Sequence, residues 1–142
     1  MSFEPVKVGS IKTGHYIIDP NSDEVCLVLS IDHSKPGKHG AAKARMMMTG
    51  LFDGKKREFV SSVDKRVNRP IIDKKYASVT NVLESSIQLM DSETFEYFEA
   101  LYPDDEALTN KIKENFEAGK TFDVEYWKVM NRIKIHSVRV TE

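Results

Sequence analysis

Apolar and polar residues alternate in short runs along the first 63 residues, which is the pattern of strands joined by turns. The runs predict strands over residues 15–19, 24–32, 43–52 and 55–63. In the second run Val25, Leu27, Leu29 and Ile31 are predicted to share one face. Asp53-Gly54 predicts a two-residue hairpin turn, because both central residues of such a turn have positive φ.

The second half repeats the strand pattern and adds one helix. Strands are predicted over residues 75–83, 86–90, 94–101, 122–129 and 133–140, and a helix over residues 104–118. Asp104 and Asp105 suit the start of that helix, and Gly119 suits its end. Its apolar stripe comprises Leu108, Ile112 and Phe116.

These elements predict an all-β fold with one short helix. Val67-Asn68-Arg69-Pro70 is interpreted as the domain junction, since Pro70 disfavours a continuous strand ladder. We expect an SH3-like barrel over residues 1–70. The order of three strands, a helix and two strands predicts an OB-fold barrel over residues 71–142.

Composition narrows the class of protein further. The chain is 40% hydrophobic and 30% charged, which is typical of a globular protein. It has no apolar run of membrane-spanning length, and its start lacks the pattern of a signal peptide. A single cysteine, Cys26, cannot form an internal disulfide, so a cytoplasmic location is expected. Residues 1–70 have 12 Lys and Arg against 8 Asp and Glu, a net of +4, whereas residues 71–142 have 9 against 14, a net of −5. This asymmetry weakly favours an RNA partner.

Residues 33–45 interrupt the strand pattern and contain no acidic residue. Their four cations are Lys35, Lys38, Lys43 and Arg45, without carboxylate partners in the local sequence. Pro36-Gly37 favours a type II turn, and Gly40 frees the backbone again beyond Lys38. The segment is therefore predicted to be a hairpin whose tip presents Lys38, with a basic surface suited to phosphates. A solvated basic loop without function is the plain alternative.

Ser34-Lys35-Pro36-Gly37-Lys38-His39-Gly40-Ala41-Ala42-Lys43-Ala44-Arg45 resembles the hypusination loop of the translation initiation factor 5A family, archaeal type. The resemblance continues in Gly50-Leu51-Phe52-Asp53-Gly54-Lys55-Lys56-Arg57 and in Gln88-Leu89-Met90-Asp91, and it covers nearly the whole chain.

The resemblance implies that Lys38 receives an aminobutyl group from spermidine through deoxyhypusine synthase, becoming deoxyhypusine or hypusine. It also implies that Gly37, His39 and Gly40 present this lysine. Residues Lys35, Lys43 and Arg45 would hold tRNA or ribosomal RNA phosphates. The family binds the ribosome beside peptidyl-tRNA and promotes peptide-bond formation at stalling sequences. No other cofactor and no DNA or membrane partner is expected.

Three alternative interpretations of these residues differ in strength. A nucleophilic or Schiff-base role for Lys38 lacks an acid–base partner, so no enzymatic activity is expected. The four histidines have no metal-ligand spacing, so no metal site is expected. The third is a general RNA-binding module, an SH3-like barrel plus an OB barrel without a modified lysine. Trp127 and Tyr126 could stack on RNA bases, although their alternation along a strand favours packing.

Overall fold

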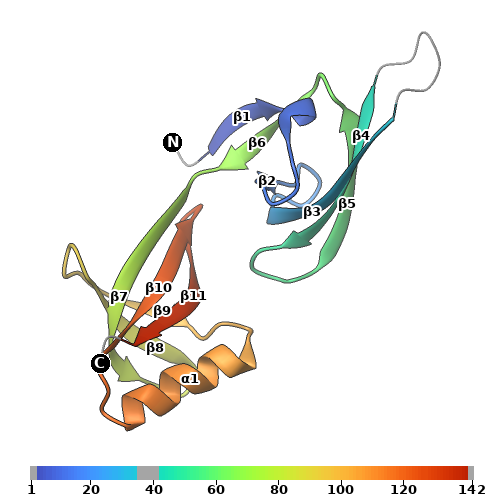
Figure 1. Ribbon diagram of the computed structural model, residues 1–142. Helices are drawn as coiled ribbons and strands as arrows, with labels where there is room; N and C mark the ends of the chain where they lie inside the picture. Colours follow the sequence, from blue (N-terminus) through green and yellow to red (C-terminus); the bar gives the residue numbers. More distant parts are fainter. Residues whose placement is uncertain (1–2, 35–41, 141–142) are drawn as a thin grey trace. The chain divides into compact units, whose positions relative to one another are not determined.

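The computed structural model describes residues 3–34 and 42–140, which form two compact units, Met1–Ile71 and Ile72–Glu142. Both units are built from antiparallel strands, and one α-helix lies in the second (Figure 1). In the described part of the chain, no helix has the length and apolar character needed to cross a bilayer.

The first unit contains a four-stranded sheet of order β2-β3-β4-β5 and a two-stranded sheet of β1 and β6. A short 3-10 helix, Val8–Ser10, follows the first strand. The strand bounds are β1 Phe3–Lys7, β2 Tyr16–Ile18, β3 Val25–Ser34, β4 Lys43–Gly50, β5 Lys56–Ser62 and β6 Arg66–Pro70. The core includes Val8, Ile17, Val28, Met46 and Met48, all at most 1% exposed. This is the small N-terminal barrel that the sequence predicts.

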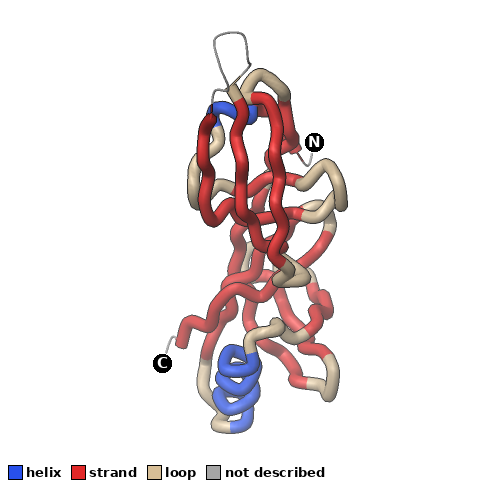
Figure 2. Tube along the Cα trace, turned by 90° about the vertical axis from the view of Figure 1, so that its right-hand side faces the viewer, coloured by secondary structure: helices blue, strands red, loops and turns tan. Residues whose placement is uncertain are grey.

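The second unit has one five-stranded sheet of order β11-β10-β7-β8-β9, and its outermost strands β9 and β11 approach each other. The bounds are β7 Ile72–Val82, β8 Ser86–Asp91, β9 Tyr97–Leu101, α1 Glu106–Glu117, β10 Phe122–Val129 and β11 Arg132–Val140. The helix packs against β7 and β11 through its apolar stripe, of which Ile112 is fully buried. Figure 2 shows α1 in blue beside the strands of the second unit. The predicted OB-fold order is confirmed.

Helix α1 begins and ends where its sequence predicts. The Asp105 carboxylate accepts hydrogen bonds from the backbone N–H groups of Ala107 and Leu108, so Asp105 is the N-cap and Asp104 is not. Gly119 has a φ of 70°, a left-handed conformation that glycine adopts at little cost.

The predicted face of β3 is wrong. The β3–β4 register shifts between Val28 and Ser30, and this bulge leaves Leu29 41% exposed. Buried residues are instead Val25, Cys26 and Val28, while Ile31 packs against the core from beyond the bulge. An extra residue at a bulge reverses which side of the strand later residues face, and local alternation cannot reveal it.

The predicted Asp53-Gly54 turn is also wrong in length. Gly54 has a φ of 67°, but Asp53 does not share the positive φ of a two-residue turn. Residues 51–55 form the connection, closed by a Gly50 N–H bond to the Lys55 carbonyl (2.8 Å). Asp53 instead accepts hydrogen bonds from the backbone N–H of Lys55 and the side chain of Arg57.

Residues 67–70, predicted as the domain junction, belong to the last strand of the first unit. They lie within β6, which pairs with β1 from Phe3 opposite Pro70 to Lys7 opposite Arg66. Pro70 is tolerated because it closes the ladder at the end of a two-stranded sheet, where few backbone donors are needed. The division between the two units follows at residues 71 and 72.

Candidate RNA-facing surface

The β3–β4 hairpin carries Lys43 and Arg45, the two sequence-predicted site residues that the structure describes. Its last pair is Ser34 opposite Lys43, and the chain between them carries the predicted modification site. Lys35, Gly37, Lys38, His39 and Gly40 lie outside the described residues, so their predicted roles stay predictions. Lys43 and Arg45 are described, and both side chains project from the exposed face of β4.

The buried alternate residues of β4 hold this end of the hairpin in place. Ala44 and Met46 are fully buried on the face opposite Lys43 and Arg45. The Val63 N–H donates to the Ala42 carbonyl (3.0 Å), which ties the hairpin to the β5–β6 turn. The two cations therefore stand on a backbone that is anchored on both sides.

Arg45 has a carboxylate partner that the local sequence does not show. Its Nε and Nη2 donate to the same Glu58 oxygen at 3.0 and 2.7 Å, across the β4–β5 ladder. The Arg45 side chain remains 64% exposed, and such exposed pairs are weak. The partner of Arg45 comes from the neighbouring strand and not from the local sequence, and the pair leaves its guanidinium accessible to a competing phosphate.

Lys43 lies in a groove that the sequence reasoning missed. This basic groove, about 480 Å³ in volume, is lined by Pro20, Lys43, Phe59, Val60, Ser61, Ser62, Lys65 and Arg66. Lys43, Lys65 and Arg66 have no ion-pair partner within residues 3–34 and 42–140, and register places Lys7 opposite Arg66. Unpaired cations beside hydroxyl groups suit a phosphate.

Nothing in local sequence marks Lys65 and Arg66 as partners of Lys43. They lie more than 20 positions from it and reach it through the β4–β5 ladder, in which Lys43 is opposite Ser62. The one sequence signal for this site is the Lys65-Arg66 pair, which closely follows the strand predicted over residues 55–63.

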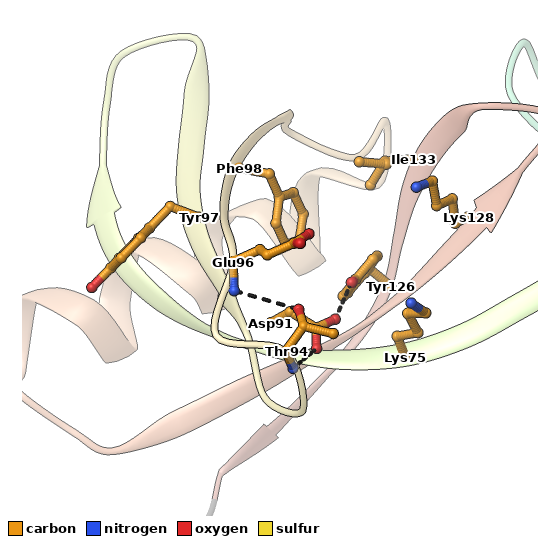
Figure 3. Close-up of a pocket in the computed structure, with 9 residues that line it drawn as sticks. All are labelled: Lys75, Asp91, Thr94, Glu96, Tyr97, Phe98, Tyr126, Lys128 and Ile133. Carbon is orange, nitrogen blue, oxygen red and sulfur yellow. Dashed lines mark hydrogen bonds between the residues drawn. The ribbon is translucent and has the colours of Figure 1, made fainter.

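The second unit contains a cavity of about 130 Å³ whose chemistry is structural (Figure 3). The buried Asp91 carboxylate accepts hydrogen bonds from the Tyr126 hydroxyl and from the backbone N–H groups of Glu93 (2.8 Å) and Thr94 (2.9 Å). The Tyr126 hydrogen bond lowers the pKa of Asp91 to about 2. Burial, followed by that bond, raises the pKa of Tyr126. At neutral pH the Asp91 carboxyl therefore stays ionised and the Tyr126 hydroxyl stays protonated, so both are poor acid–base groups. Their role is to hold the β8–β9 turn.

The two aromatic residues considered for base stacking are packing residues. Tyr126 is 4% exposed and lies 4.8 Å from the Phe98 ring. Trp127 is stacked on His136 at 4.3 Å, and Lys74 Nζ lies 4.7 Å from the Trp127 ring centroid. Both rings are occupied within the fold. Residues 3–34 and 42–140 include no group of three His, Cys, Asp or Glu side chains able to hold a metal ion.

Comparison with known proteins assigns the family. Residues 2–65 match the family described as "Translation initiation factor 5A-like, N-terminal". Residues 71–139 match "Eukaryotic elongation factor 5A hypusine, DNA-binding OB fold". "Translation initiation factor 5A" of Pyrococcus furiosus is 43% identical over 137 residues, 96% of this chain and 95% of its own length.

The chain belongs to the translation initiation factor 5A family. Solved structures agree with this assignment. The factor 5A of Methanococcus jannaschii is 33% identical, with a TM-score of 0.80 over 96% of this chain and 95% of its own. A factor 5A family protein of Naegleria fowleri is 27% identical, with a TM-score of 0.85 over 99% of this chain and 100% of its own. The family predicted from the hairpin motif is confirmed, together with its two-barrel fold.

Proposed function

We propose that this chain is a translation factor that binds the ribosome beside peptidyl-tRNA and promotes peptide-bond formation where elongation stalls. Its active form carries deoxyhypusine or hypusine at Lys38. The observation that carries the proposal is family membership along nearly the whole chain, combined with the loop sequence of that family between residues 34 and 45. The factor acts in the cytoplasm and has no catalytic activity of its own.

Modification changes Lys38 in a way that suits a nucleic-acid partner. A bond forms from Lys38 Nζ to the aminobutyl carbon of spermidine as the C–N bond of spermidine breaks, which leaves 1,3-diaminopropane. Deoxyhypusine synthase performs this transfer, and no resident cofactor is needed in the factor. The longer side chain then has two amines, so it gains reach and positive charge toward phosphates.

The basic groove supports a phosphate-bearing partner for the first unit. Lys43 belongs both to the family loop sequence and to the groove, so a tRNA or ribosomal RNA backbone bound there would contact the first residue of β4. Contacts to phosphates position a complex without reading sequence. The factor would thereby reduce the entropy of positioning the acceptor end, while the ribosome performs the chemistry.

The decisive experiment is intact-mass and peptide analysis of the protein purified from its own cells. We expect an aminobutyl addition on Lys38, with or without one further oxygen atom. An unmodified Lys38 in native material would overturn the hypusine mechanism.

An RNA-binding module without a modified lysine is the second candidate, and the basic groove favours it equally. Lys38→Arg separates the two, because arginine keeps the charge but cannot accept the aminobutyl group. We expect this variant to lose the capacity to relieve stalling in a reconstituted translation assay with a consecutive-proline reporter. Retained activity in the variant would favour the plain RNA-binding module.

Groove residues can be tested separately from the modification. We expect Lys65→Ala/Arg66→Ala to weaken binding of deacylated tRNA and to reduce the dependence of log K on log salt by roughly 1–2. Fluorescence anisotropy across a salt series measures both quantities. The matched control, Lys12→Ala/Lys120→Ala, removes the same charge from exposed positions outside the groove. Equal loss in both variants would show that only net charge matters.

A further inference from the structure

The outer face of β9 exposes large apolar side chains at the edge of the five-stranded order. Along β9 the side chains alternate, so Tyr97, Glu99 and Leu101 point outward while Phe98 and Ala100 face the core. Tyr97 is 74% exposed and Leu101 76% exposed. Scattered apolar residues are ordinary on a surface, but a group of them on one strand marks an interaction site.

Phe95 adds a third exposed apolar side chain in the turn before β9, and it is 66% exposed. Its φ is 62°, a left-handed conformation that is unfavourable for a bulky residue and easy for glycine. The Phe95 N–H donates to the Asp91 carbonyl (3.0 Å), a backbone bond that glycine at this position would also make. The turn geometry therefore does not account for the phenyl ring at this position.

An open groove of about 570 Å³ runs beside these residues. Its lining is Thr80, Asn81, Gln88, Tyr97, Phe98 and Glu99, from β7, β8 and β9. The Tyr97 ring lies between this groove and the Asp91 cavity, and in Figure 3 it points away from Asp91 and Tyr126. The face thus combines apolar rings with a recess that hydrogen-bonding side chains line.

The electrostatics of this face select the class of partner. Residues 76–110 contain eight Asp and Glu and no Lys, Arg or His. Glu93, Glu96 and Glu99 are all exposed, and Glu99 shares the outward face of β9 with Tyr97 and Leu101. Lys75 and Lys128 line the adjoining cavity together with Glu96, so they moderate the negative field at one end only. Such a field repels phosphate backbones and attracts cationic segments.

We infer that the outer face of β9 and the adjoining turn bind a Lys- or Arg-rich segment of a partner protein that also carries apolar side chains. The carboxylates of Glu99 on this face and of Glu93 in the adjoining turn pair with its cations. The exposed rings of Phe95 and Tyr97 accept both apolar side chains and cations over their faces. This inference concerns the second unit alone and does not depend on Lys38 or the basic groove.

A second copy of the chain is a weaker occupant. The positive charge lies in residues 1–70, so self-binding would join the first unit of one copy to the second unit of another. Such a contact closes into a dimer or a ring where its rotation permits and otherwise builds open chains, and each of these raises the particle mass. Growth of the particle with concentration in light scattering would therefore identify self-assembly and overturn the inference.

The test uses the full chain and a fluorescent twelve-residue peptide in which lysine alternates with leucine. Two control peptides replace every lysine with glutamate or every leucine with serine. We expect the lysine–leucine peptide to bind at least about tenfold more tightly than either control, since both the charge and the apolar contacts contribute. Amide resonances of residues 93–101 should shift on binding. Equal affinity for all three peptides, or shifts confined to other residues, would refute the inference.

Substitutions locate the contact. Tyr97→Ser/Leu101→Ser should weaken peptide binding about fivefold or more. The matched control Leu29→Ser/Ile71→Ser changes two other exposed apolar residues and should leave affinity unchanged. Circular dichroism confirms that each variant is folded. If the β9 variant is folded and binds as the control does, the inference is wrong. Stronger binding of a twelve-nucleotide uridine RNA than of the peptide at the same residues would also overturn it, in favour of a nucleic-acid partner.

Discussion

Asp91 and Tyr126 form the interaction of the second unit whose contribution to stability can be estimated most directly. Asp91→Ala removes a 4% exposed carboxylate and with it hydrogen bonds from one hydroxyl and two backbone N–H groups. The N–H donors of Glu93 and Thr94 lie in an exposed turn and can bind water instead. The Tyr126 hydroxyl is buried and is left without a hydrogen-bond partner, so the full free energy of its bond to Asp91 is lost. With about 1.5–3 kcal/mol for a bond to a charged acceptor, we expect a loss of about 3 kcal/mol.

Tyr126→Phe should cost less, about 1.5 kcal/mol, because Asp91 keeps its two backbone donors. In the double variant both hydrogen-bonding groups are absent, so no buried group is left without a partner. The losses in unfolding free energy of the two single variants should therefore not add. We expect a coupling free energy of about 1 kcal/mol or more from the double-mutant cycle.

Urea unfolding followed by the fluorescence of Trp127 measures these free energies. This is the chain's single tryptophan, next to Tyr126 on β10, so its signal reports the second unit. Asp104→Ala serves as a control, since Asp104 is exposed and is not the helix cap. It should change stability by less than about 0.5 kcal/mol. Losses below that value in both Asp91→Ala and Tyr126→Phe, or additive losses, would refute the reasoning.

The pH dependence provides an independent check on the same pair. The pKa of Asp91 is lowered to about 2 in the folded chain, whereas an unfolded aspartate titrates near about 3.9. The unfolded state therefore takes up the proton first as pH falls. The stabilisation is fully present above about pH 4 and disappears as pH falls toward 2. The stability difference between wild type and Asp91→Ala should shrink across that window, and a constant difference would contradict the assignment.

Three further outcomes test the packing of the two units. Gly50→Ala should lower stability by about 1–3 kcal/mol in urea unfolding monitored by circular dichroism, because the added Cβ would collide with the Asp53 carboxylate and come 2.7 Å from Arg57 Nη1; unchanged stability would contradict that geometry. Burial raises the pKa of the Cys26 thiol to about 11, so a thiol reagent at pH 8 should react only after unfolding, and rapid stoichiometric labelling of the native chain would be inconsistent. Ile112→Ala should cost about 2–5 kcal/mol by the tryptophan assay, and a neutral result would mean that α1 does not pack on the barrel.

Several elements follow from the sequence because their causes are local. The cap at Asp105, the left-handed Gly119 and the apolar stripe through Ile112 all lie within or next to one helix. Strand β10 has the predicted bounds, Phe122–Val129, since alternation extends through its whole length. The family motif around Lys38 is equally local, so family and fold could both be predicted from residues read in order.

Other features depend on which strands meet, and local sequence carries little information about that. The bulge near Leu29 and the pairing of Phe3 with Pro70 are set by the ladders of whole sheets. Register over such separations reflects the total burial of both strands, which no short window records. For this reason the sequence alone determined the barrels, the helix and the family motif around Lys38. Only the tertiary structure decided that Arg45 pairs with Glu58 and that Lys43 shares a groove with distant cations, because side chains become neighbours only once their strands are aligned.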